Sequence, residues 1–146
     1  MDYSSPILHA ALMLVLLKWA AEHWLDRLNE SHVRKHADKV PDALRDVMDD
    51  ATYAKSVQYT LAKSRFARIE NLFGALLLLT ALLSGALPWL FNVTVDALGE
   101  SIWAMSGYLI GVMLIFMLAG LPLDWRAQFR LEERFGFNTT TQATWW

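Results

Sequence analysis

Two long apolar stretches without any charged residue limit what this chain can fold into. They cover residues 72–90 and 102–123, and each is close to the length of about 20 residues that an α-helix needs to cross a bilayer. Only 19% of the residues are charged and 55% are apolar, with a mean hydropathy of +0.25. Soluble domains carry about 25% charged residues, so the composition favours an integral membrane protein.

A third apolar stretch, near the N-terminus, is weaker. Residues 7–25 begin with an apolar run that only His9 interrupts, and they end with polar side chains. A signal peptide would need a basic segment before the apolar run, and residues 1–6 contain neither Lys nor Arg. We therefore predict an all-α integral membrane helical bundle with three transmembrane helices, at 7–25, 72–90 and 102–123.

The segment between the first two spans, residues 26–70, is polar. Its nine Lys and Arg residues lie among a similar number of acidic and histidine side chains, which is typical of solvated helices at a membrane surface. The net charge of −2 also argues against a nucleic-acid partner. We expect a long helical loop, with a short helix from Pro41 that has Asp42 in its first turn, and a longer helix from near Asp50.

The distribution of Lys and Arg predicts the orientation in the membrane. The loop 26–70 has nine of them, the short turn expected at 92–101 has none, and the tail 125–146 has three. The positive-inside rule places the loop and the tail in the cytoplasm, and the N-terminus and the 92–101 turn outside.

Three polar residues follow the apolar part of the first span. Lys18 and Glu22 are four residues apart, so they share one helix face, and His23 adjoins that face. They form either an intrahelical ion pair at the membrane interface or a polar face turned toward a water-filled interior. In the third span, Gly107 and Gly111 are a pair of small residues that fits either a contact with a neighbouring span or a dimer seam.

His32 and His36 have the four-residue spacing of zinc ligands on a helix. Arg34 and Lys35 lie between them and would repel a metal ion, and no Glu follows His32 to act as a general base. We do not expect a zinc site there.

Two polar and aromatic blocks carry the most information about function. Residues 129–141 read FRLEERFGFNTTT, and Gly136 predicts a helix end there because glycine adopts left-handed backbone angles readily. Residues 50–66 form the second block. The first resembles the E-E-x-F-G-F-N-x-x-T block of the integral-membrane CAAX prenyl proteases, and the second resembles their segment before the second span. These proteases are zinc metalloendopeptidases.

The resemblance points to thirteen residues as candidate site residues. In the first block they are Glu132, Glu133, Phe135, Gly136, Phe137, Asn138 and Thr141, and in the second they are Tyr53, Lys55, Tyr59, Lys63, Arg65 and Phe66. The first set is expected to shape a loop through hydrogen bonds or to touch the substrate directly. Glu132 and Glu133 are not expected to act as an acid–base couple, because adjacent helical residues point about 100° apart.

The resemblance implies that residues 1–146 are the N-terminal membrane domain of a zinc metalloendopeptidase that cleaves prenylated or other membrane-associated C-terminal peptides. The implied partners are the bilayer, the remaining catalytic portion of the protease and the peptide substrate. It also implies that Lys18, Glu22 and His23 face a hydrated chamber. The zinc motif His-Glu-x-x-His is absent from the chain, so no catalytic or metal-binding residue is assigned, and we expect the chain alone to bind no zinc and to be inactive.

Two other classes of protein compete with this interpretation. One is a non-catalytic three-span membrane protein that acts as a scaffold or binding partner. The other is a small transporter or channel subunit, which the absence of charge within 72–90 and 102–123 disfavours, because translocation paths usually carry polar groups.

Overall fold

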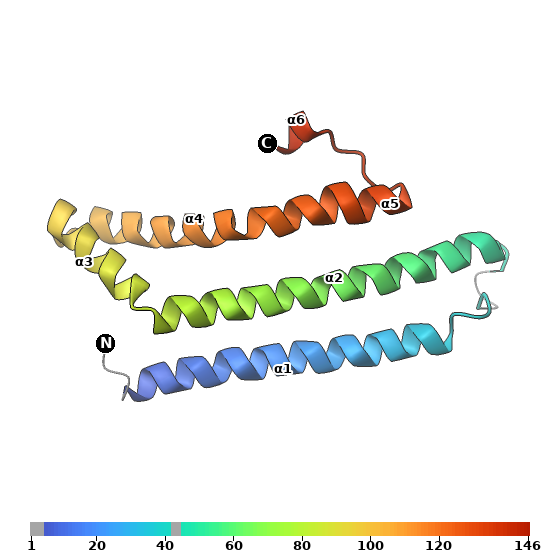
Figure 1. The fold of residues 1–146 in the computed structure, drawn as a ribbon, viewed down its shortest axis with the longest axis horizontal. Coiled ribbons are helices and arrows are strands. Elements are labelled where there is room, and N and C mark those ends of the chain that lie inside the picture. Colours follow the sequence, from blue (N-terminus) through green and yellow to red (C-terminus); the bar gives the residue numbers. More distant parts are fainter. Residues whose placement is uncertain (1–4, 42–44) are drawn as a thin grey trace. The chain divides into compact units, whose positions relative to one another are not determined.

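The computed structural model describes residues 5–41 and 45–146, and all regular structure within them is helical (Figure 1). The elements are α1 (Pro6–Lys35), α2 (Asp50–Leu83), α3 (Ala86–Leu98), α4 (Ile102–Arg126), the π-helix η2 (Ala127–Glu132), α5 (Glu133–Phe135) and α6 (Gln142–Trp145). The predicted all-α class is therefore confirmed for these residues.

The chain divides into two compact units, each described here by itself. One contains Met1–Trp19 and Leu72–Pro122 and is called the apolar unit. The other contains Ala20–Asn71 and Leu123–Trp146 and is called the polar unit. Each of the long helices α1, α2 and α4 has one part in the apolar unit and the other part in the polar unit.

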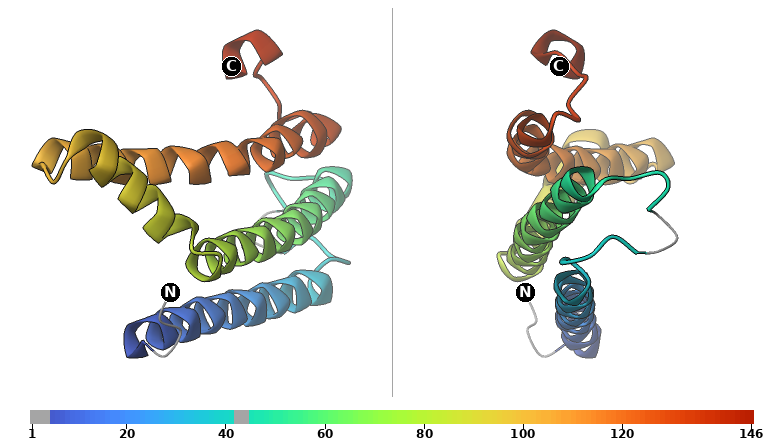
Figure 2. Two further views of the ribbon diagram at one scale, coloured as in Figure 1. Left: turned by 60° about the vertical axis from the view of Figure 1, so that its left-hand side comes forward. Right: turned by 90° about the vertical axis from the view of Figure 1, so that its right-hand side faces the viewer.

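Within the apolar unit, α3 packs on α4. The Tyr108 hydroxyl donates a long hydrogen bond of 3.4 Å to the Leu87 carbonyl oxygen, and the Tyr108 ring meets the Phe91 ring edge-on, with 5.6 Å between centroids. Figure 2 shows α3 between the break that ends α2 and the start of α4. Ser101 caps the N-terminus of α4, because its Oγ accepts a hydrogen bond from the Ala104 backbone N–H at 3.1 Å.

The prediction of one continuous helix over 72–90, followed by a turn over 92–101, was wrong. Helix α2 ends at Leu83, Gly85 adopts a left-handed conformation with φ of 77°, and α3 then continues to Leu98. Pro88 is the third residue of α3, where a backbone N–H has no partner inside the helix, so the proline helps to start a helix instead of ending one.

Two helices of the described residues are long and apolar enough to cross a membrane, α2 and the continuous helix Ile102–Phe135. Helix α3 is apolar but shorter. Helix α1 covers the whole predicted first span but is not one of the two. Its apolar run contains His9 and is followed by Lys18, Glu22 and His23. The structure thus supports a multi-pass membrane protein and does not confirm three spans.

Very few side chains are buried. Among the described residues, only Val40, Ala104 and Phe135 have apolar side chains that are buried, and no polar side chain is buried. Large apolar residues of the spanning helices are open, such as Met113 at 71% and Leu109 at 61%. A surface of this kind suits lipid or further helices, not water.

The N-terminus of α2 is capped by the carboxylate of Asp49. Asp49 Oδ1 accepts a hydrogen bond of 2.8 Å from the Thr52 backbone N–H, and this bond lowers the pKa of Asp49. Helix α2 begins at Asp50, as predicted. Pro41 is not helical, and Asp42, which was expected in the first turn of a short helix, lies outside the described residues.

Candidate functional site

The two sequence blocks meet in the polar unit, and Tyr59 of α2 is where they join. Its hydroxyl donates a hydrogen bond of 2.7 Å to Glu132 Oε1 in η2, across 73 residues of sequence. Lys63 lies one turn further along α2 and donates to the Tyr59 hydroxyl at 3.2 Å, and its Nζ lies 3.9 Å from Glu132 Oε1. The Glu132 carboxylate, which is 21% exposed, is therefore held by one phenol and one ammonium group.

Aromatic contacts surround the same tyrosine. The ring of Phe135 meets the Tyr59 ring edge-on at 5.3 Å between centroids, and the ring of Phe137 does so at 4.8 Å. Such edge-on pairs are favourable by about 0.5–1.5 kcal/mol beyond the area they bury. Lys55 Nζ lies 5.8 Å from the centre of the Phe137 ring, so the first turns of α2 also contact the second phenylalanine.

Gly136 lets the chain turn so that Phe135 and Phe137 both contact Tyr59 of α2. It has a φ of 79°, its N–H donates to the Glu133 carbonyl at 3.0 Å, and the Phe137 N–H donates to the Glu132 carbonyl at 2.9 Å. This pair of bonds is a Schellman motif, which ends the helix and reverses the chain. The predicted glycine cap is confirmed.

The Asn138 side chain joins the loop to the preceding helix. Its Oδ1 accepts from Gln128 Nε2 at 2.6 Å and from the Thr140 N–H at 2.9 Å, while its Nδ2 donates to Glu133 Oε2 at 3.1 Å. Glu132 and Glu133 thus bind different groups, one on α2 and the other in the loop. Sequence reasoning missed Gln128, whose partner depends on the width of the π-helical turn that carries it.

The loop ends at Thr141, which caps α6. Its Oγ1 accepts from the Thr144 N–H at 3.3 Å and bonds the Thr144 hydroxyl at 2.8 Å. Helix α6 then brings Trp145 edge-on to Phe129 of η2, at 6.2 Å between ring centroids.

The remaining predicted residues lie outside this cluster. The Tyr53 hydroxyl donates to the His36 carbonyl at 2.7 Å. Arg65 is exposed and Phe66 half-buried, and neither makes a hydrogen bond or ring contact with the cluster within the described chain. Glu22 and His23 are half-buried in the polar unit, and Lys18 belongs to the apolar unit. None of these last three is without an interaction partner, and a chamber-facing role for them stays a prediction.

A second contact between helices, which sequence reasoning missed, joins α1 to α2. Arg68 and Arg34 both donate hydrogen bonds to the Glu30 carboxylate, the latter at 2.7 Å, and Glu30 is only 13% exposed. The hydrogen bond from Arg68, followed by that from Arg34, lowers the pKa of Glu30 to about 2. The four-residue spacing of Glu30 and Arg34 was visible in the sequence, but the partner on α2 was not.

The residues do not fit a zinc ion. No group of three His, Asp, Glu or Cys side chains converges within residues 5–41 and 45–146. His32 and His36 lie with their rings 4.3 Å apart, but His36 Nδ1 is hydrogen-bonded to the His32 carbonyl at 2.8 Å. Zinc proteolysis requires three protein ligands and an open position, which these residues do not supply.

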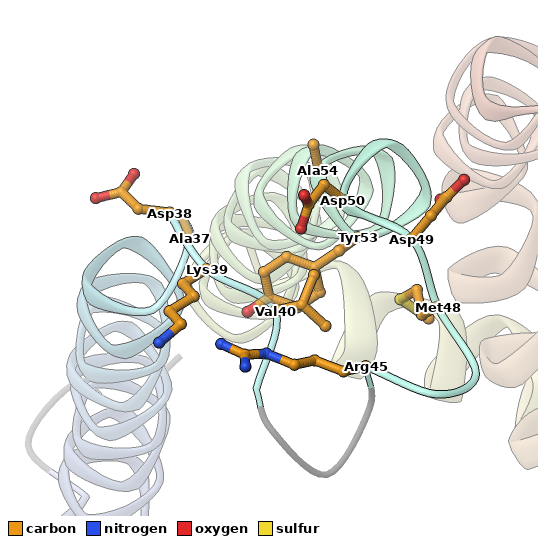
Figure 3. A pocket seen from close by; sticks show the side chains of 10 residues that line it. All are labelled: Ala37, Asp38, Lys39, Val40, Arg45, Met48, Asp49, Asp50, Tyr53 and Ala54. Atoms are coloured by element: carbon orange, nitrogen blue, oxygen red, sulfur yellow. The ribbon is translucent and has the colours of Figure 1, made fainter.

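An open pocket of about 710 Å³ lies where the linker meets the start of α2 (Figure 3). Its walls carry both cations, such as Lys39, and anions, such as Asp38 and Asp50. The lining comes from both sides of residues 42–44, which are outside the described ranges, so the pocket is given no function.

Comparison with known proteins agrees with the geometry. Residues 29–146 match the family described as CAAX prenyl protease N-terminal, five membrane helices. The chain is 30% identical to CAAX prenyl protease 1 of Saccharomyces cerevisiae over 117 residues. This alignment covers 73% of this chain and 26% of the relative. It is 29% identical over 138 residues to the CAAX prenyl protease 1 homolog of Homo sapiens, covering 88% of this chain and 29% of that protein.

A plant relative matches over a similar length. The CAAX prenyl protease 1 homolog of Oryza sativa is 28% identical over 148 residues, covering 93% of this chain and 33% of the relative. The chain therefore spans about a quarter to a third of the length of these relatives.

Proposed function

Because the chain belongs to the CAAX prenyl protease N-terminal family, we propose that it forms part of the membrane wall of a zinc endopeptidase that cleaves prenylated C-terminal peptides. The observation that carries this proposal is the match over residues 29–146, together with the direct contact between the two sequence blocks at Tyr59 and Glu132. Those blocks were singled out for their likeness to the family, and they form one joined cluster.

In this proposal the cluster holds the cytoplasmic ends of the helices in register. The Tyr59–Glu132 bond and the two phenylalanines fix α2 against η2 and α5, and Asn138 fixes the loop that follows. Glu132, Glu133, Asn138 and Thr141 all make hydrogen bonds inside the polar unit, which supports a role in shaping the loop over direct contact with the substrate.

The proposal includes the chemistry that the rest of such a protease would supply. Zinc and its ligands would come from the catalytic portion, and the substrate would be a prenylated or related membrane peptide. The 146 residues alone, purified in detergent, are then expected neither to hydrolyse a prenylated peptide nor to retain zinc through dialysis. Hydrolysis that a chelator abolishes would contradict this.

We also propose that α1 is a third membrane segment, with loop 26–70 and the tail in the cytoplasm and the N-terminus outside. The chain contains no cysteine, so single cysteines can report the topology cleanly. Ser31→Cys in α1 is expected to resist a membrane-impermeant maleimide added to intact cells, and Asp96→Cys in α3 to react with it. Both residues are exposed in the structure, so the reverse pattern would overturn the orientation.

The decisive test of function is a chimera. The matched region of Saccharomyces cerevisiae CAAX prenyl protease 1 is replaced by this chain, and cleavage of a prenylated peptide is measured together with zinc content. We expect cleavage. A chimera that inserts into membranes and binds zinc but leaves the peptide intact would favour a non-catalytic scaffold instead.

A further inference from the structure

Three exposed arginines follow the predicted third span at four-residue intervals. They are Arg126 at the end of α4, Arg130 in η2 and Arg134 in α5, and these elements form one uninterrupted helical segment. Four-residue spacing places them along one side of that segment. The three arginines are called the arginine stripe.

The stripe is not neutralised by its neighbours. Within the described residues, neither Arg126 nor Arg130 pairs with a carboxylate, and Arg134 only lies over the Phe135 ring, at 5.6 Å. The adjacent carboxylates are engaged elsewhere, Glu132 by Tyr59 and Lys63, and Glu133 by Asn138. Two further acids lie near this segment: Asp124, which is exposed, and Glu70 of α2, which is close enough to Asp124 to interact with it electrostatically.

Four aromatic residues, called the aromatic column, lead from the same segment to the end of α6. The Trp125 ring is 5.7 Å from the Phe129 ring, Phe129 is 6.2 Å from Trp145, and Trp145 is 4.9 Å from Trp146, which is 82% exposed. Tryptophan is enriched where hydrocarbon meets headgroups, because its ring is apolar and its N–H is polar. The aromatic column is an observation independent of the arginines, and both indicate the interfacial layer.

Distance along the helix decides which arginines can reach that layer. The predicted span 102–123 ends at Leu123, so distances are counted from there. At the 1.5 Å per residue of an α-helix, Arg126 lies about 5 Å beyond Leu123, Arg130 about 10 Å and Arg134 about 16 Å. The headgroup layer on each side of a bilayer is about 5–8 Å thick. Arg126 therefore lies within it, Arg130 reaches back to it with its long side chain, and Arg134 lies beyond it.

We propose that Arg126 and Arg130, beside the aromatic column, bind the phosphate groups of anionic phospholipids at the membrane surface. The guanidinium group suits this ligand because it donates paired hydrogen bonds to phosphate oxygens. The proposal rests on the proposed function in that it takes α4 as a membrane span with its C-terminal end in the cytoplasm, but it does not depend on proteolysis.

The test uses the full chain in a neutral detergent, titrated with short-chain phosphatidylglycerol and, separately, with phosphatidylcholine and inorganic phosphate. Wild type is expected to bind phosphatidylglycerol with an affinity that falls as salt rises. R126Q/R130Q should lose about five-fold in affinity per arginine. The control R134Q should lose less than two-fold.

Charge-retaining and folding controls complete the design. R126K/R130K is expected to lose less affinity than R126Q/R130Q, because lysine keeps the positive charge but not the paired hydrogen bonds. The helical content of each variant is checked by circular dichroism. Equal affinity of wild type and R126Q/R130Q would overturn the proposal, as would equal loss in R134Q or in R126K/R130K, or equally tight binding of inorganic phosphate. Because no peptide is cleaved in this assay, an inactive chimera would leave the result unaffected.

Discussion

At the scale of single residues, one hydrogen bond between a phenol and a carboxylate, from Tyr59 to Glu132, connects the two stretches of sequence that make up the polar unit. A hydrogen bond to a charged group contributes about 1.5–3 kcal/mol, and less where water has access, as at the partly exposed Glu132. We expect Tyr59→Phe and Glu132→Gln each to lower the free energy of unfolding by about 1 kcal/mol. Their double variant should lose less than the sum of the two, because both remove the same bond.

The measurement is equilibrium unfolding of the four proteins in mixed micelles, followed by tryptophan fluorescence. Glu133→Gln is the matched control, because its carboxylate binds Asn138 and not Tyr59. Strict additivity of Tyr59→Phe and Glu132→Gln would show that the two groups do not interact.

Glu30 predicts how the contact between α1 and α2 responds to acid. Its pKa is lowered to about 2 from an ordinary value of 4.5, so its stabilising effect is complete above pH 4.5 and disappears as pH falls toward 2. The shift corresponds to no more than about 3.5 kcal/mol. Glu30→Gln should flatten the decline in stability between pH 5 and 2, whereas Asp96→Asn, at an exposed position of α3, should leave it unchanged.

An acid titration of the thermal midpoint of the chain in detergent checks this expectation. If the wild-type and Glu30→Gln midpoints fall in parallel over this range, the ion pair with Arg68 contributes nothing to the pH dependence.

At the scale of elements, the left-handed turn at Gly136 is the most sensitive point. A Cβ added there would meet only Lys55 Nζ at 3.9 Å, so space is available, but a φ of 79° is unfavourable for alanine. We expect Gly136→Ala to cost about 1–2 kcal/mol and to increase hydrogen exchange in the loop that follows. Gly74→Ala in α2 is the control, because a Cβ there would meet no atom within 4 Å and the residue does not have a left-handed φ. Equal effects of the two substitutions would contradict the argument.

Element boundaries could be predicted where a local signal specifies them. The start of α2 at Asp50 and the end of α5 at Gly136 were both foreseen, since an acidic first turn and a glycine cap are read from neighbouring residues. The break at Gly85 was missed, because the apolar pattern runs on without a charged residue through the end of α2 and the first turn of α3, where Pro88 lies.

For contacts between elements, the sequence indicated which residues matter but not which of them pair with each other. Family likeness selected Tyr59 and Glu132 as candidates, but their pairing depends on how α2 and η2 lie in space. Gln128 and Arg68 carry no signal of their own, since polar residues at helix surfaces usually face solvent. Gly107 and Gly111 were expected to pack closely on another helix, and within the described chain a Cβ at either would meet nothing within 4 Å.

At the scale of the whole molecule, the shortage of buried side chains predicts behaviour in solution. With only Val40, Ala104 and Phe135 buried among the described residues, the apolar helix faces need lipid, detergent or other helices to cover them. We expect the isolated chain to self-associate in detergent, which light scattering measures directly. A monodisperse monomer would contradict this.

The separation of 73 residues between Tyr59 and Glu132 in the sequence also determines when that contact can form. Ribosomes add about 5–20 residues per second, so roughly 4–15 s separate the synthesis of the two residues. During this interval the rest of α2, α3 and α4 are made, and Glu132 is not yet present to bind Tyr59. Contacts between residues distant in sequence form late, because closing the intervening loop costs entropy before the contact stabilises it. The two blocks therefore join late in biosynthesis, after α3 and α4 have been made.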